Sequence, residues 1–262
     1  MEPLGNAHRL PEDIRRIADQ LVVDRCGDDP QSFMRTEDIV GYVAPNSPYR
    51  IGADQLTPFE GRPDIPAIPE PVGAPPHIRV GGVWNRAENI VADNANIFGG
   101  LGTLTLADPT LAIPEAPATA ATLGFYGARL LNTGDPVVFE ADRNLPITIT
   151  GFGAGYAAGF LQVEGKGGGA FVEYHDLPHL HMPFEDQAHG HFLLARADGD
   201  DYLLSAFRIP YGQAVYTPPN VLHADPFLIG RYLVVYSVTR HYSTVVFRTG
   251  GGEIVETRIA AT

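Results

Sequence analysis

Cysteine is nearly absent from this sequence of 262 residues, which contains only Cys26. A single thiol excludes a disulfide within the chain. Long apolar runs are also missing, since no stretch approaches the roughly 20 residues of a membrane-spanning helix. The first residues lack the basic segment and following apolar segment of a secretory signal. We therefore expect a cytoplasmic protein that does not act at a membrane.

Basic residues are few as well, with 18 Lys and Arg against 31 Asp and Glu and a formal net charge of −13 at pH 7. Proteins bind phosphate backbones mainly through Lys and Arg, so we expect no nucleic-acid partner. Apolar residues make up 44% of the chain and charged residues 19%, as is ordinary for a globular protein. The acidic balance, together with a pocket that we expect to be lined by Phe, Leu, Val and Tyr, favours a small, partly apolar substrate over a polymer.

The first 118 residues form a mixed segment, which we treat as an N-terminal extension. Apolar side chains at helical spacing predict an amphipathic helix over residues 11–24, and Thr36 suggests a second short helix over residues 36–40. Seven prolines between residues 57 and 77 predict an extended arm. Short strands are expected between residues 77 and 111, and a linker at 112–118.

From residue 119 onward, short apolar segments alternate with Gly, Asp, Asn and Pro. Such spacing, with no long helix between the strands, favours an antiparallel sandwich or barrel. We therefore predict an all-β domain over residues 119–262. Its candidate strands are residues 122–131, 136–140, 147–150, 158–163, 170–174, 191–196, 202–209, 213–216, 232–239 and 243–248.

Histidines are concentrated in one stretch of this domain, where six of the nine in the chain lie between His175 and His223. In a strand, residues i and i+2 point to the same face, so His179 and His181 can present both imidazoles to one point inside a barrel. Glu185 would share that face if the strand continued past Pro183. His223 can add a third imidazole from another strand. Three nitrogens and one carboxylate suit iron, manganese, nickel, zinc or copper.

These residues resemble the first motif of the cupin superfamily, which is His, any residue, His, three or four residues, then Glu. His179, His181 and Glu185 match it with a gap of three residues. In the family the motif opens with a Gly six residues before the first His, where this chain has Glu173. The sequence also contains a second His-x-His, formed by His189 and His191, and either residue could replace Glu185 as a ligand.

The second cupin motif is Gly, five residues, Pro, one residue, Gly, two residues, His. Gly212, Pro218 and His223 match it at those spacings, and Asn220 stands in place of the second Gly. Asn tolerates the positive φ that such a turn needs better than most residues. The resemblance covers roughly residues 120–250, about half of the chain.

The resemblance implies a cupin-type double-stranded β-helix, or jelly-roll barrel, that holds one divalent transition metal per chain, most often Fe(II). It implies a dioxygenase-type oxidoreductase acting on a small organic substrate. Two other functions stay open: a redox-neutral isomerase, epimerase, cyclase or lyase on the same site, and a barrel that binds a small molecule without catalysis. We also expect a homodimer or larger homo-oligomer, because long N-terminal extensions often wrap a neighbouring subunit.

Two further residues are candidates for catalysis. Tyr216, next to the second motif, can act as an acid or base, and Arg208 can hold a substrate carboxylate by a two-pronged contact. Arg196 and Arg231, on other predicted strands, offer the same contact. Each of these side chains also fits a purely structural role.

Overall fold

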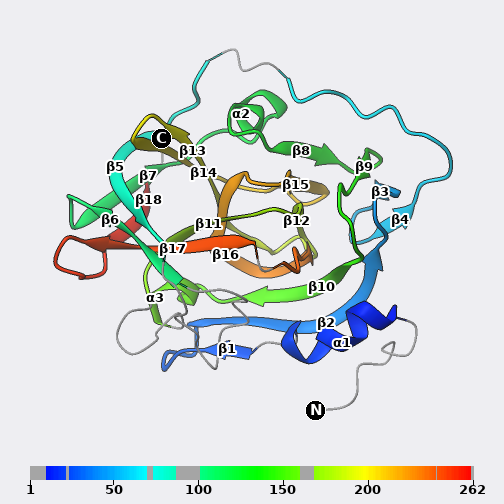
Figure 1. The fold of residues 1–262 in the computed structure, drawn as a ribbon, viewed down its shortest axis with the longest axis horizontal. Helices are drawn as coiled ribbons and strands as arrows, with labels where there is room; N and C mark the ends of the chain where they lie inside the picture. The colour runs from blue at the N-terminus through cyan, green and yellow to red at the C-terminus, as the bar shows by residue number, and fades with distance from the viewer. Residues whose placement is uncertain are drawn as a thin grey trace.

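The fold is mostly β, as the sequence predicts (Figure 1). The computed structural model describes residues 10–21, 24–69, 73–86, 101–159, 168–239 and 241–260. Thirteen of the described strands form one large sheet that closes into a ring. The helices are short: α1 (Glu12–Leu21), α2 (Ala120–Phe125) and α3 (Tyr156–Gly159).

Seven strands make up the ring, and its closure comes from β13, which pairs with β14 on one side and β16 on the other. Most neighbours are antiparallel, whereas β17 and β6 run parallel. In ring order the strands are β16 (Leu222–Val235), β11 (Phe171–His175), β17 (Tyr242–Thr249), β6 (Leu101–Leu106), β5 (Ile78–Asn85), β14 (Asp201–Phe207) and β13 (His189–Asp198).

The long strand β16 leaves this ring at its C-terminal half and takes new neighbours there, β10 and β12. On one side follow β10 (Leu145–Phe152), β2 (Phe33–Val43) and β1 (Asp24–Cys26). On the other side follow β12 (His179–Pro183), β15 (Gln213–Thr217) and β8 (Arg129–Asn132). Two small sheets complete the described part of the chain. One contains β4 (Leu56–Pro58), β3 (Pro48–Ile51) and β9 (Pro136–Val138), and the other contains β7 (Thr110–Pro114) and β18 (Glu256–Ala260).

Strand alternation gives β12 and β15 a different core on each face. Leu180 lies opposite Tyr216, and both belong to a core outside the ring. His181 lies opposite Val215, which belongs to the larger core together with Phe192 of β13. Because paired residues share a face and neighbours along a strand alternate, the histidines of β12 point toward the larger core.

Strands from the N-terminal 118 residues pair directly with strands of the later part of the chain. β2 pairs with β10, β5 with β14, and β6 with β17. The predicted N-terminal helix is confirmed as α1, whose buried Ile14 and Leu21 contact Ile39 of β2. None of the described helices combines the length and the apolar character needed to cross a membrane.

The short helix predicted over residues 36–40 is wrong, because these residues lie within β2. Met34, Thr36, Ile39 and Val43 are buried there, and the strand pairs with β10 over eight positions with two bulges. Pairing with a strand more than a hundred residues away therefore outweighs the local capping signal of Thr36.

Three other local predictions also differ from the structure. The start of the strand predicted at 122–131 is α2, which Thr119 caps through a reciprocal contact with Thr122. The linker predicted at 112–118 begins inside β7, which pairs with β18 at the other end of the chain. The strand predicted from residue 158 begins in α3, and residues 160–163 lie outside the described residues.

The proline-rich arm has the extended form that the sequence predicts. Beyond β4, residues 59–69 and 73–77 contain no helix or strand, and the arm joins β4 to β5. It runs along the outside of the molecule, past α2 and β8 (Figure 1). Proline denies the backbone donors that a sheet needs, so the arm cannot join the neighbouring strands.

Gly190 of β13 is required where this strand pairs with β16, and Gly199 offers a matched comparison. Gly190 has φ 89°, and an added Cβ would lie 2.1 Å from the carbonyl oxygen of Phe227. Gly199 has φ 67°, with no atom within 4 Å of an added Cβ.

Gly199→Ala should lower the free energy of unfolding by about 1–2 kcal/mol, whereas Gly190→Ala should lower it by about 4 kcal/mol or more, as measured in urea titrations. Equal losses would contradict this account of the ring closure.

Candidate metal centre

Two histidines flank the tight connection between β11 and β12. His175 ends β11 and His179 begins β12. The Nδ1 of His175 lies 2.8 Å from the carbonyl oxygen of Leu177, and a carbonyl only accepts, so this nitrogen carries the proton. Ser237 Oγ braces the same connection by donating to the carbonyl oxygens of Leu177 and Pro178, at 3.0 and 2.7 Å.

A carboxylate, a third imidazole and a threonine hydroxyl lie side by side on three neighbouring strands. Glu173 of β11 pairs with His223 of β16 on one side and with Thr244 of β17 on the other. Thr244 Oγ1 donates to Glu173 Oε2 at 2.8 Å, and Glu173 Oε1 lies 3.9 Å from His223 Nε2. The threonine hydroxyl therefore orients the carboxylate so that its other oxygen faces the imidazole.

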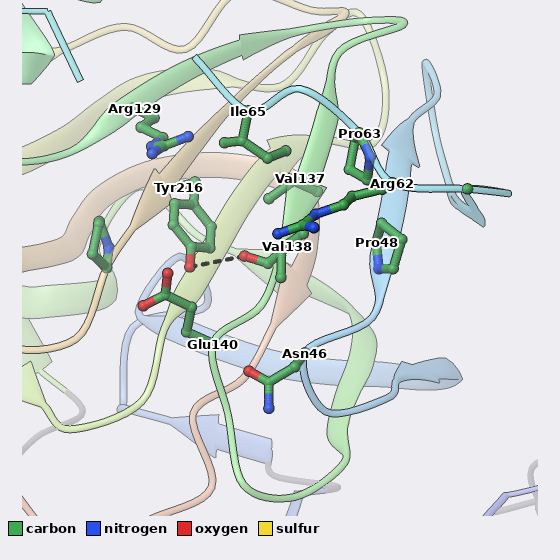
Figure 2. Close-up of a pocket in the computed structure, with 12 residues that line it drawn as sticks. Asn46, Pro48, Arg62, Pro63, Ile65, Arg129, Val137, Val138, Glu140 and Tyr216 are labelled. Atoms are coloured by element: carbon green, nitrogen blue, oxygen red, sulfur yellow. Dashed lines mark hydrogen bonds between the residues drawn. The ribbon is translucent and has the colours of Figure 1, made fainter. Parts of the chain in front are cut away.

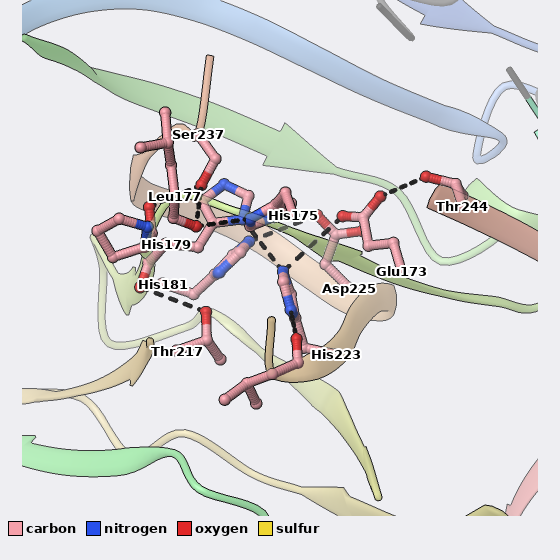
Figure 3. A network of polar contacts seen from close by, with 12 residues as sticks. Glu173, His175, Leu177, His179, His181, Thr217, His223, Asp225, Ser237 and Thr244 are labelled. Carbon is pink, nitrogen blue, oxygen red and sulfur yellow. Dashed lines mark hydrogen bonds and ion pairs between the residues drawn. The ribbon is translucent and has the colours of Figure 1, made fainter. Parts of the chain in front are cut away.

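The ring nitrogens of the three histidines meet at one point (Figure 3). His179 Nδ1 lies 3.1 Å from His175 Nε2 and 3.2 Å from His223 Nε2. His223 Nδ1 donates to the carbonyl oxygen of Val221 at 2.8 Å, so His223, like His175, presents the lone pair of its Nε2. Two nitrogens bound to one ion at about 2.0–2.1 Å lie roughly 2.9–3.4 Å apart, which matches these separations.

Burial keeps all three imidazoles neutral at pH 7, the state in which histidine binds metals. The exposed fractions of His175, His179 and His223 are 6%, 5% and 1%. Burial lowers the pKa of His175 to about 4. Burial, followed by the charges of neighbouring imidazoles, also lowers the pKa values of His179 and His223 well below the usual value.

Together these residues form a group that could hold one metal ion, made of Glu173, His175, His179 and His223. Their ligand atoms all lie within 4.8 Å of one another. His179 Nε2 is buried without a hydrogen-bond partner among the described residues, and it carries the ring proton when Nδ1 binds an ion. Three imidazoles and a carboxylate fit the expected single metal site, and the set does not distinguish among the first-row transition metals.

The structure brings together some of the ligands proposed from the sequence and places others nearby. His179 and His223 belong to the group. The ring of His181 lies beside it, 4.8 Å from that of His179 between centroids, and its Nε2 is 3.5 Å from Asp225 Oδ2. Glu185 follows the end of β12, outside the group, and its carboxylate lies 3.8 Å from the guanidinium of Arg231.

Glu173 and His175 occupy the group although the cupin motifs did not indicate them. They are two residues apart on β11, so they share a face in the same way as His179 and His181 of β12. This Glu-x-His alternation begins six residues before the His-x-His of β12, and it was the signal available in the sequence. Glu173 also occupies the position where the family motif opens with a glycine.

The turn of the second motif has the backbone conformation that the sequence predicts. Asn220 has φ 64° and Gly212 has φ 80°, both in the left-handed region. The backbone nitrogen of Asn220 donates to the carbonyl oxygen of His175 at 2.7 Å. This bond ties the turn that precedes His223 to the strand that carries Glu173 and His175.

The residues proposed for catalysis lie elsewhere. Tyr216 points to the opposite face of its sheet from His179 and His181, as the pairing of Leu180 with Tyr216 requires. Arg208 is exposed, and its Nε donates to Glu115 Oε1 at 3.1 Å.

The second His-x-His and the remaining candidate arginines bind neighbouring groups of the chain. His191 Nε2 contacts Glu115 Oε2 at 3.0 Å, and the exposed His189 contacts the carbonyl oxygen of Gln187 at 2.8 Å. Arg231 donates to Glu37 at 2.8 Å, and Arg196 donates to the carbonyl oxygen of Phe125 at 3.1 Å.

Comparisons of the chain with protein-family models, with curated proteins and with solved structures found no match. The interpretation of the site therefore depends on the positions of the described side chains and on the motif spacings.

Acid should destabilise the metal-free protein through the three buried histidines. The folded-state pKa values lie below the usual 6.5, so between pH 7 and pH 5 the unfolded chain takes up protons that the folded chain does not. Stability is therefore highest above pH 6.5 and falls as the pH drops toward the folded-state pKa. We expect a loss of about 2 kcal/mol per buried histidine over this interval, measured by urea unfolding with a chelator present.

Two variants separate this effect from general acid sensitivity. His175→Gln should reduce the loss between the two pH values by roughly a third, because one of three buried imidazoles is gone. His189→Gln should leave the loss unchanged, because His189 is exposed. A protein equally stable at both pH values, or an unchanged loss in His175→Gln, would contradict the burial of neutral imidazoles.

Proposed function

We propose that the chain is a metal-dependent enzyme that holds one divalent transition metal in a cupin-type barrel, with Glu173, His175, His179 and His223 as ligands. The observation that carries this proposal is the meeting of three imidazole nitrogens, 3.1 and 3.2 Å apart, beside an oriented carboxylate. His175 and His223 each donate a hydrogen bond from Nδ1 to a backbone carbonyl, which is the usual arrangement of histidines that bind metals through Nε2.

Two features support a cupin-type barrel as the scaffold. The strands close into a ring, and His179 and His223, one from each family motif, lie with ring nitrogens 3.2 Å apart on the paired strands β12 and β16. Asn220 adopts the positive φ that the second motif needs at that position. The ligand set differs from the family pattern, because Glu173 and His175 of β11 take the places expected for Glu185 and His181.

We propose dioxygenase-type oxidation of a small organic molecule as the reaction. Bound Fe(II), the metal that the cupin resemblance implies most often, would supply the binding and activation of dioxygen. The chain's own contribution is to keep bulk water away from the site, since the three imidazoles are at most 6% exposed. His181, beside the group and 3.5 Å from Asp225, is placed to hold or accept a proton there.

Metal content of purified variants tests the ligand assignment. The wild-type protein should contain about one transition-metal ion per chain by elemental analysis. The metal affinity of His175→Ala and of Glu173→Gln should fall by more than 10- to 100-fold, the loss typical when a residue that only hydrogen-bonds to a metal ligand is removed. Glu185→Gln is the matched control, which should keep the metal because its carboxylate lies against Arg231.

Three outcomes would contradict this assignment. They are a wild-type protein that neither contains nor takes up a transition metal, loss of metal in Glu185→Gln, and full metal content in Glu173→Gln. Circular dichroism and urea unfolding of each variant would establish that the chain is folded when its metal is measured.

Nitric oxide tests whether an iron site could accept dioxygen, without knowledge of the substrate. Four protein ligands leave open positions on an ion that prefers six, so nitric oxide added to Fe(II)-loaded protein without oxygen should produce an iron–nitrosyl EPR signal. Zinc-loaded protein is the control and should give no such signal. An Fe(II)-loaded protein that gives none either would favour a redox-neutral role for the metal.

A further inference from the structure

A second candidate site lies on the outer face of the molecule, under the proline-rich arm (Figure 2). It is a cavity of about 510 Å³, within the range of small-molecule pockets. Arg62 and Ile65 of the arm line one side, and Val137 of β9 and Tyr216 of β15 line the other. The arm therefore forms part of the wall of a cavity as well as a connection between β4 and β5.

This cavity is distinct from the candidate metal centre. Tyr216 lines the cavity and lies opposite Leu180, whereas His179 and His181 point to the other face of the same sheet. The layer formed by β12 and β15 therefore separates the two sites. A ligand in the cavity would not touch the group of imidazoles.

The charges around the cavity favour a ligand with a single negative charge. The charged lining residues are Arg62, Arg129 and Glu140, which carry two positive charges and one negative charge, or a net charge of +1. Figure 2 shows both guanidinium groups directed toward the cavity, and Glu140 near the Tyr216 hydroxyl. The negative charge of Glu140 disfavours dianions such as phosphate or dicarboxylates.

Arg129 supplies the most specific observation. Its Nε is buried and has no hydrogen-bond partner within the described part of the chain. The described residues therefore leave this lining guanidinium without a bond at its Nε, and a carboxylate is the anion that arginine recognises most specifically, because it can accept two N–H groups at once. The Nε itself is closed off from the cavity, so a carboxylate there would accept from the terminal N–H groups of the same guanidinium.

The remaining walls fit an uncharged, partly apolar body. Ile65, Val137 and Val138 contribute apolar surface, and several prolines add to it. The Tyr216 hydroxyl donates to the carbonyl oxygen of Val138 at 3.2 Å, so its oxygen can still accept a hydrogen bond from a ligand. Burial raises the pKa of Tyr216 to about 12, so this hydroxyl stays protonated at neutral pH.

We propose that this cavity binds a small monocarboxylic acid, with its carboxylate against Arg129 and Arg62 and its apolar body against Ile65 and Val137. The site requires no metal, so it stands apart from the function proposed for the group of imidazoles. Its ligand is a separate molecule from any substrate held inside the ring.

Binding of benzoate, measured by calorimetry and by saturation-transfer NMR on the full chain, tests this proposal. We expect a dissociation constant on the order of 1 mM or tighter for benzoate, and at least about tenfold weaker binding of benzamide and of inorganic phosphate. Benzamide has nearly the same shape without the charge, and phosphate has more charge without the apolar body. Equal binding of benzamide, or tighter binding of phosphate, would overturn the proposal.

Three variants locate the binding. Arg129→Gln should weaken benzoate binding by about 10- to 100-fold, as removal of a charge-assisted hydrogen bond does. Arg62→Gln, on the exposed arm, should weaken it without an effect on folding. Arg143→Gln is the control, because Arg143 is exposed, pairs with Asp142 and does not line the cavity. Unchanged benzoate binding in both Arg129→Gln and Arg62→Gln would overturn the proposal, whatever the metal content of the protein.

Discussion

The structure depends on the pairing of one long strand, β16, with different neighbours along its length. Its N-terminal half pairs with β13 and β11 and closes the ring, and its C-terminal half pairs with β10 and β12. The neighbours change near Gly230, where φ is 97° and an added Cβ would lie 2.9 Å from Ala188 Cα. The same strand therefore sets the register of both halves of the sheet.

The candidate metal centre is a direct consequence of this register. Pairing with β11 places His223 beside Glu173, and pairing with β12 holds the strand that begins with His179. The short connection between β11 and β12 then brings His175 to the same point. Four ligands from three strands meet because two pairings of β16 and one tight connection fix their positions.

Three neutral imidazoles that meet in a buried site destabilise the fold unless something binds their lone pairs. One proton on His179 Nδ1 cannot satisfy both neighbouring nitrogens, and buried polar atoms without partners cost free energy. A metal ion in place of that proton would accept one lone pair from each of the three rings. The arrangement is therefore better explained by a ligand site than by the needs of the core.

Local patterns in the sequence predicted the strand content, the arm, α1, the turn at Asn220 and the close approach of His179 and His223. They failed where distant pairing decides the outcome, as in β2, where a capping signal at Thr36 is outweighed by pairing with β10. Glu185 illustrates the same limit, because the face it shares with His179 exists only if the strand continues, and β12 ends at Pro183. Tyr216 is close to the second motif in sequence, yet alternation directs it to the other face.

The most direct test of the account is a crystal structure of the metal-loaded protein with an anomalous difference map recorded at the absorption edge of the metal. The account predicts one strong peak, about 2.0–2.2 Å from His175 Nε2, His179 Nδ1, His223 Nε2 and a carboxylate oxygen of Glu173. A peak bound by His181 and Glu185 in place of His175 and Glu173, or no peak among these residues, would contradict it.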